Sequence, residues 1–348
     1  MVYQDKAAKV HAESIVIDGL NISNWQESET FSYLNQGGVT AINATVAVWE
    51  NFPETLDNIA RWYPRFEEYS DIIMPARTAA DIERAKAEGK CGIIFGFQNS
   101  SPIEDDLRRL RIFYELGVRV IQVTYNRSNF VGSGYTDLPD YGLSNFGLDF
   151  VEECNRLDIL LDCSHAGHKT TMDTIEVSKK PIAFTHAAPR VLWNIQRNKT
   201  DEELKALAAK GGVVGACGYA YFLAQKEKAT LSDFVDTIDY LVRLVGIEHV
   251  GIGMDFTQGQ SRQWLQWMVR GRNIDRIPRL QAGSQEQRQD WIRARQDPSF
   301  SPIYSKGFAT PADFPNLTRA LLETGYSESN VQQILGKNFL RLFREVLS

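Results

Sequence analysis

The feature that most constrains this fold is an alternation that repeats along the chain. Short apolar runs rich in β-branched residues recur, and each is followed by a longer segment with helical periodicity. Such alternation is typical of parallel β/α units. The eight predicted strands are Ser14 to Gly19, Val39 to Val46, Gly92 to Phe97, Val118 to Thr124, Ile159 to Ser164, Pro181 to Thr185, Val213 to Cys217 and Val250 to Met254. The predicted helices include Pro53 to Tyr69, Thr78 to Glu88, Ile103 to Leu116, Phe146 to Leu157, Asp201 to Lys210 with Thr200 as N-cap, and Val331 to Leu347.

Two architectures repeat β/α units in this way, a doubly wound open sheet and a closed barrel. The first predicted strand ends in Asp18-Gly19-Leu20-Asn21, without the glycine-rich phosphate loop of many open sheets. Polar residues stand at the C-terminal ends of five different strands: Gln98, Tyr125, His165, His186 and Asp255. Barrel enzymes assemble their sites at this rim, so we expect residues 1–348 to form a single (β/α)8 barrel domain.

One segment interrupts the alternation. Residues 258–306 are largely polar and hold three of the seven tryptophans, Trp264, Trp267 and Trp291. Trp264, Trp267 and Val269 can form a short amphipathic face, which more often packs on its own subunit than recognises a partner. We therefore interpret 258–306 as an insertion within the barrel. A lid over the barrel mouth or a subunit interface is the functional alternative.

Composition excludes several classes of protein. A chain of 348 residues with 43% hydrophobic and 24% charged residues is typical of a globular protein. The net charge of -6 is interspersed, which disfavours a nucleic-acid partner. The start lacks a signal-peptide pattern and no run reaches ~18 apolar residues, so we expect a cytoplasmic protein without a membrane partner. The four cysteines lie in or beside apolar runs and predict buried reduced thiols.

Two histidines end apolar strands, His165 in LLDCSH and His186 in PIAFTH. Neighbouring parallel strands lie ~4.8 Å apart, so side chains at their ends can converge on one divalent ion at ~2.1 Å. A structural histidine is the alternative for each. Asp255 in GIGMDF could bind metal, take a proton from water, or cap a helix. Arg197 in NIQRN could clamp a substrate carboxylate or be a solvated surface residue.

At these residues the chain resembles the membrane-dipeptidase (renal dipeptidase, peptidase M19) family. The matching blocks are IDGLN, FGFQN, VTYNRSN, GLSNFG, DCSHAG, THAAPR, QRNKTDEELKALAAKGGVVG, GIGMDF and ILGKNFLRL. They cover nearly the whole length in the family's order. The resemblance implies a (β/α)8 barrel of the amidohydrolase kind, with a two-metal centre that hydrolyses dipeptides in typical members.

Carried over by position, the resemblance implies that His165 and His186 hold one metal, Asp255 handles protons and Arg197 binds the substrate carboxylate. The family's first-strand His-x-Asp ligands are here Leu20 and Ile22, and its bridging glutamate is Gln98. A histidine that polarises the scissile carbonyl is here Tyr125. Loss of two ligands and a bridging charge disfavours two dications ~3.5 Å apart.

Three hypotheses remain open. The first is a hydrolase with one divalent ion, zinc first, on His165 and His186, acting on a small carboxylate-bearing amide or dipeptide-like substrate. In it, Asp255 is base and acid, Tyr125 donates to the oxyanion, and Arg197, Asn126 and Gln98 contact the substrate. The second is a metal-free lyase or isomerase, and the third is a non-catalytic binding protein. Typical family members also suggest a homodimer.

Overall fold

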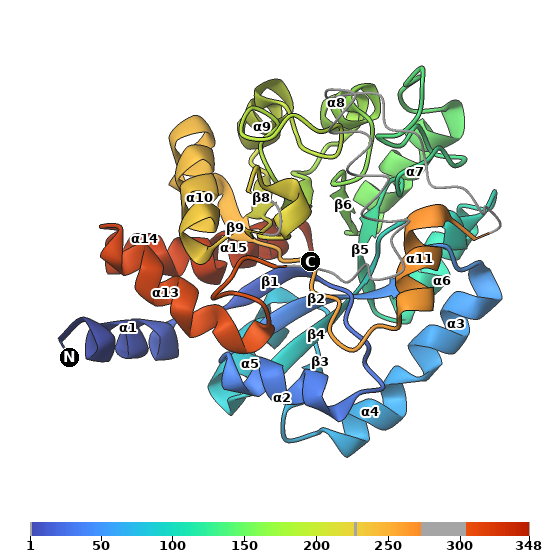
Figure 1. Ribbon diagram of the computed structural model, residues 1–348. Helices are drawn as coiled ribbons and strands as arrows, with labels where there is room; N and C mark the ends of the chain where they lie inside the picture. The colour runs from blue at the N-terminus through green and yellow to red at the C-terminus, as the bar shows by residue number, and fades with distance from the viewer. Residues whose placement is uncertain (1, 226–227, 273–303, 348) are drawn as a thin grey trace.

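The strands of the computed structural model close into a barrel, as the alternation predicts. The structure describes residues 2–225, 228–272 and 304–347. Eight parallel strands form a ring that closes where β2 pairs with β4 and β9 pairs with β1, and helices surround this ring (Figure 1). The barrel strands are β1 Ile17–Asn21, β2 Ala41–Ala47, β4 Cys91–Phe97, β5 Val118–Gln122, β6 Leu160–Asp162, β7 Ala183–Ala187, β8 Val213–Ala216 and β9 Val250–Ile252. The predicted (β/α)8 fold is therefore confirmed.

The helices follow the strands in the expected order. The first half of the chain has α1 Val2–Glu13, α2 Ser28–Gln36, α3 Phe52–Ala60, α4 Trp62–Glu68, α5 Ala79–Glu88, the 3-10 turn η1 Ser101–Ile103 and α6 Arg108–Glu115. The middle has α7 Asn145–Arg156, α8 His168–Val177, α9 Asp201–Ala209, the 3-10 turns η2 Ala220–Phe222 and η4 Ile247–His249, α10 Leu231–Val245 and α11 Arg262–Arg270. The last part has the 3-10 turn η5 Pro311–Asp313, α13 Phe314–Glu323, α14 Glu328–Gln332, the π-helical turn η6 Gln333–Lys337 and α15 Asn338–Val346.

Local signals account for several helix ends and fail at others. Thr200 caps α9 as predicted, because its side chain accepts from Glu203 N–H while Glu203 accepts from the Thr200 backbone. The helix predicted over Pro53 to Tyr69 is two helices, α3 and α4, with Arg61 between them. The helix predicted from Ile103 begins only at Arg108, after the 3-10 turn η1.

A further strand, β3 (Ile73–Pro75), is missing from the predicted set. It pairs with the first residues of β4, Cys91 to Ile93, whereas β5 pairs with Phe95 to Phe97 at the other end of β4. Because β2 also pairs with β4, β3 lies beside the closed ring and does not belong to it. A run of three residues ending in proline carries no periodicity that a sequence pattern can detect.

The C-terminal helix α15 packs against one end of the barrel, where Phe339, Leu340 and Phe343 share a buried cluster with strand residues. Phe339 of α15 is fully buried between β1 and β9. A Cβ atom at Gly19 or Gly251 would lie 2.7 or 2.6 Å from the Phe339 ring, so both positions require glycine. With this end packed, a site can form only at the opposite end, where the strands terminate.

The described part of the interrupting segment contains the helix α11, whose Val269 is buried. Trp291 lies outside the described residues. All four cysteines are buried and free, as predicted. Among the residues that the structure describes, we find no helix with the length and apolar character needed to cross a bilayer.

Candidate active site

The predicted site residues lie at the C-terminal ends of the barrel strands. His186 is in β7 itself, His165 follows β6, Tyr125 and Asn126 follow β5, Gln98 follows β4 and Asp255 follows β9. Arg197 lies in the connection between β7 and α9. All of these except Asp255 are buried. Two of the residues, Asn126 and Asp255, have positive φ angles of 60° and 56°. Such conformations in residues other than glycine are concentrated at functional sites.

The two histidines meet as predicted. His165 Nε2 lies 2.9 Å from His186 Nε2. The other ring nitrogen of His165 lies 2.7 Å from Asn126 Oδ1, which can only accept, so this nitrogen carries the proton. His186 Nδ1 lies 2.9 Å from Thr185 Oγ1. The single Thr185 hydroxyl proton is donated to Asp162 Oδ2 at 2.6 Å, so Thr185 must accept from His186.

These partners leave a lone pair on each Nε2 atom, and the two lone pairs face each other. Two acceptors at this distance repel unless a cation or a proton lies between them. Imidazole ligands of metals are usually oriented by a hydrogen bond from the second ring nitrogen, as both rings are here. Burial lowers the pKa of His186 well below its ordinary value, and the positive charges of Arg197 and Lys199 lower it further. The neutral form required of a metal ligand is therefore favoured.

Asp162 holds Thr185, the hydrogen-bond partner of His186, in position. Its carboxylate accepts from Ser164 N–H at 2.8 Å, Ser164 Oγ at 2.6 Å and Thr185 N–H at 3.1 Å, in addition to the Thr185 hydroxyl. Burial raises the pKa of Asp162, and these donors oppose that rise by stabilising the carboxylate. Sequence reasoning missed Asp162 and Thr185. The signal was available, because a charged residue within the apolar strand LLDCSH needs a partner.

Tyr125 packs against the histidine pair. Its ring stacks on the His165 ring with centroids 4.3 Å apart, and Trp49 meets it edge-on at 5.4 Å. Tyr125, Ile22 and Val48 form a buried apolar cluster, which Trp49 and residues of α11 cover. Trp49 Nε1 donates to Met268 O of α11 at 2.8 Å.

This cluster brings together two of the replacements at the rim, Ile22 and Tyr125. Leu20 and Ile22, which occupy the family's ligand positions on the first strand, are each 2% exposed. Ile22 and Tyr125 belong to the apolar surface on which α11 rests. In the described residues, Trp264 and Trp267 thus pack on their own subunit, against the cluster of Ile22, Val48 and Tyr125.

Gln98 and Asp255 follow β4 and β9, and neither completes a metal-binding group with the histidine pair among the described residues. Gln98 Nε2 donates to Thr45 Oγ1 at 3.1 Å, and its buried Oε1 has no hydrogen-bond partner among the described residues. The Asp255 backbone accepts from Tyr304 Oη at 2.9 Å and donates to Leu20 O at 3.1 Å. Within the described ranges, no three His, Cys, Asp or Glu side chains are arranged to hold one ion.

Arg197 lies beside the pair, beneath the protein surface. Its Nη2 donates to His186 O at 2.9 Å and its guanidinium lies 4.7 Å from the Phe222 ring centre. The side chain is 2% exposed, and neither Nε nor Nη1 has a hydrogen-bond partner among the described residues. A buried cation with spare donors favours a bound anion, and the planar fork suits a carboxylate.

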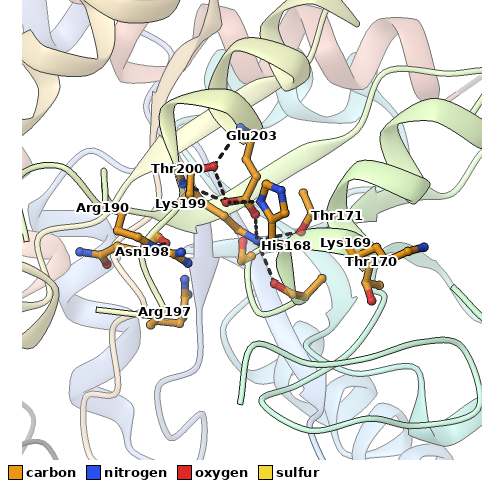
Figure 2. Close-up of polar contacts among 12 residues, drawn as sticks. His168, Lys169, Thr170, Thr171, Arg190, Arg197, Asn198, Lys199, Thr200 and Glu203 are labelled. Carbon is orange, nitrogen blue, oxygen red and sulfur yellow. Dashed lines mark hydrogen bonds and ion pairs between the residues drawn. The ribbon is translucent and has the colours of Figure 1, made fainter. Parts of the chain in front are cut away.

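A buried ion pair fixes the segment that carries Arg197 (Figure 2). Lys199 Nζ donates to Ala166 O at 3.0 Å, to Thr171 Oγ1 at 2.9 Å and to Glu203 Oε1 at 3.2 Å. Lys199 and Glu203 have side chains 3% and 1% exposed. Because Ala166 follows His165, this lysine ties the loop after β6 to the loop that carries Arg197. Sequence reasoning missed the pair, although a lysine four residues before a capping-box glutamate is a visible signal.

Asp18 is a second buried carboxyl near the site. It accepts from Met254 N–H at 2.9 Å and from Asn21 Nδ2 at 3.2 Å, and so joins β1 to the end of β9. Burial raises its pKa from 3.8 to about 7, and the negative charge of Asp255 contributes. Asp18 can therefore take up or release a proton near neutral pH.

Solved structures of related proteins share this fold. An amidohydrolase from Pseudomonas aeruginosa is 39% identical, with a TM-score of 0.88 over 98% of this chain and 99% of that one. A metallopeptidase from Rhodobacter sphaeroides, solved with a phosphinate mimic of the dipeptide L-Ala-D-Ala, is 20% identical, with a TM-score of 0.76 over 96% of this chain and all of that one. At 20% identity, the likeness to the metallopeptidase shows only that the two proteins share a fold.

Two curated relatives whose sequences match this chain are named dipeptidases. The dipeptidase tcpJ of Claviceps purpurea is 28% identical over 284 residues, 80% of this chain and 57% of its own length. An uncharacterised dipeptidase of Schizosaccharomyces pombe is 36% identical over 181 residues, 50% of this chain and 44% of its own length. The matches thus span about half the length of these relatives. The family profile described as membrane dipeptidase (peptidase family M19) matches residues 4–267 and 296–348. The chain belongs to the membrane dipeptidase family, peptidase family M19.

Proposed function

We propose that this member of the family is a hydrolase that uses one divalent ion, with zinc the first choice, held by His165 and His186. The observation that carries the proposal is the pair of Nε2 lone pairs that face each other 2.9 Å apart. Asn126 and Thr185 hold the opposite ring nitrogens and orient both lone pairs. Metallopeptidases among the solved neighbours support metal use in this family.

The donor set fits one ion better than two. Two imidazoles on a tetrahedral zinc would have nitrogens ~3.4 Å apart, from a Zn–N distance of ~2.1 Å, so the pair must open by about half an ångström. Gln98 Oε1 is a buried acceptor without a partner among the described residues and could supply a further oxygen ligand. Leu20 and Ile22 offer no ligand for a second ion, and α11 covers the cluster that includes Ile22.

The side chains of this site suit hydrolysis of a small amide that bears a carboxylate, including dipeptide-like molecules. A bound zinc ion supplies a Lewis acid and lowers the pKa of water to ~7. Asp255 receives the proton from the attacking water and returns it to the leaving amine. Tyr125 donates a hydrogen bond to the developing oxyanion, and the spare Arg197 N–H groups hold the substrate carboxylate. Asn126 and Gln98 contribute polar contacts to the bound substrate.

Metal analysis of the purified protein tests this proposal. We expect about one equivalent of zinc per chain after incubation with zinc and desalting, as measured by elemental mass spectrometry. A His165→Ala, His186→Ala variant should lose it. A His249→Gln variant is the matched control, because this histidine contacts Gly212 O at the opposite end of the barrel. Zinc retained by the double variant would contradict the assignment. Zinc-dependent hydrolysis of dipeptides and N-acyl amino acids should then depend on Arg197.

One observation favours a second candidate, a metal-free acid–base enzyme such as a lyase or isomerase. The distance of 2.9 Å between the Nε2 atoms is that of a hydrogen bond, so one shared proton would also satisfy both lone pairs. Such a pair could donate and accept protons. Absence of bound metal after incubation with excess zinc, in a protein that remains folded, would reject the hydrolase mechanism and support this candidate.

A further inference from the structure

A separate cavity lies beside the half of the barrel mouth that lacks the family's first-strand metal ligands. Its volume is about 370 Å³, within the range of small-molecule sites. It lies between the ends of β1 and β2, the helices α3 and α4, and α11. Ile22 and Thr45 line it, whereas the histidine pair and Arg197 do not. The cavity is therefore next to the candidate active site and distinct from it.

Four tryptophans line it; Trp264 and Trp267 are half-buried, whereas Trp25 and Trp62 are 7% and 2% exposed. Trp25 and Trp62 lie with ring centres 5.3 Å apart, and Trp264 and Trp267 of α11 lie 6.1 Å apart. Indole faces favour flat aromatic groups through stacked or edge-to-face contacts. Trp264 and Trp267 thus provide apolar lining for the cavity and also pack against the cluster of Ile22, Val48 and Tyr125.

Two arginines line the same cavity and an adjoining one of about 550 Å³. Arg61 donates to Asn58 Oδ1 at 3.3 Å, and Arg65 donates to Arg61 O at 2.9 Å, so most of their N–H groups remain available. No carboxylate oxygen of the described residues lies within 4 Å of either guanidinium. Burial and the charge of Arg61 lower the pKa of Arg65, as expected for two cations held close together.

Two acidic groups face this region. Glu50 lines the cavity, but its carboxylate accepts from Val48 N–H, Trp49 N–H and Asn58 Nδ2 at 2.7, 3.1 and 3.1 Å. Glu68 lines the adjoining cavity and offsets the Arg65 charge only in part. Two arginines and one glutamate line the first cavity, and the glutamate already accepts three hydrogen bonds. The net charge of this lining is positive, which favours a bound anion.

We propose that this cavity binds a small aromatic carboxylate, with its ring against the indoles of Trp264 and Trp267 and its carboxylate on Arg61 and Arg65. The planar guanidinium is suited to carboxylates, and the aromatic wall selects a flat ring over an aliphatic one. The binding site does not depend on a metal ion or on the proposed hydrolysis.

Three probes separate the contributions of ring and charge: 1-naphthylacetate, its neutral amide 1-naphthylacetamide, and cyclohexylacetate. Isothermal titration calorimetry should give the tightest binding for 1-naphthylacetate. An Arg61→Gln, Arg65→Gln variant should bind it at least tenfold more weakly. Arg84→Gln is the matched control, because Arg84 is an exposed arginine paired with Asp81 on α5 and should leave the affinity unchanged.

The histidine double variant distinguishes this cavity from the active site. Binding of 1-naphthylacetate should persist in His165→Ala, His186→Ala even if that variant has lost all metal. Loss of binding there, with the arginine variant unaffected, would place the ligand at the active site and overturn the proposal. Equal affinities for 1-naphthylacetate and its amide would overturn the role of the arginines.

Discussion

Asp18 gives this fold a measurable pH dependence. Its carboxyl is 1% exposed, and burial raises its pKa from 3.8 to about 7. Between pH 3.8 and about pH 7, Asp18 is protonated in the folded state and ionised in the unfolded state. The free energy of unfolding contributed by this residue therefore falls as pH rises through this window. Replacing Asp18 by asparagine removes the titration while its Oδ1 can still accept from Met254 N–H.

The size of the effect follows from the two pKa values. At ~1.36 kcal/mol per pKa unit, ionising Asp18 in the folded state costs about 4 kcal/mol once both states are charged. Between pH 5 and pH 8, about 2 to 3 kcal/mol of that cost should develop. The Asp18→Asn variant should therefore gain about this much stability relative to the wild-type protein across the interval.

Urea denaturation at several pH values between 5 and 8 measures this difference. A constant offset between the two proteins is expected from the changed contact with Asn21 and carries no information about the titration. The control is Asp57→Asn, at a solvent-exposed position of α3, whose curve should run parallel to that of the wild-type protein. A parallel curve for Asp18→Asn as well would refute the reasoning.

Three further predictions concern the surroundings of the site. Thr185→Val removes the acceptor for His186 Nδ1 and should weaken zinc binding about 10- to 100-fold in a chelator competition; unchanged affinity would argue against this orienting role. Lys199→Met removes the buried cation of the Glu203 carboxylate, leaves only the exposed His168 beside it, and should lower the free energy of unfolding by about 3 kcal/mol. Adding Glu203→Gln should recover much of that loss, and an equal loss in both variants would contradict the pairing. Leu20→His with Ile22→Asp places a carboxylate in the apolar cluster and should cost about 2 kcal/mol or more without zinc. An unchanged melting temperature would contradict the account of that cluster.

The barrel was predictable because its strands are continuous apolar runs and its polar residues stand at one end. His165 and His186 were placed correctly since neighbouring parallel strands bring their C-terminal side chains together. β3 could not be predicted, because three residues show no periodicity and their pairing depends on β4. The split between α3 and α4 at Arg61 was equally invisible to a helical pattern.

The environment of each site residue was less predictable than its position. Tyr125 stacks on His165, and Ile22 joins an apolar cluster that α11 covers. Both arrangements depend on contacts between segments that are distant in the sequence. The resemblance identified Ile22 and Tyr125 as departures from the family pattern, but only packing shows what replaced the lost ligands. The Asp162 and Thr185 support under His186 likewise arises from the pairing of β6 with β7.

The most direct test of the central claim is zinc K-edge X-ray absorption on the protein loaded with one equivalent of zinc. One ion on His165 and His186 predicts scattering from two imidazole rings with Zn–N distances of ~2.1 Å and no second metal. Loading with two equivalents should leave this spectrum without a metal–metal feature. A zinc–zinc distance of ~3.5 Å, or a spectrum without imidazole scattering, would contradict a single ion held by this histidine pair.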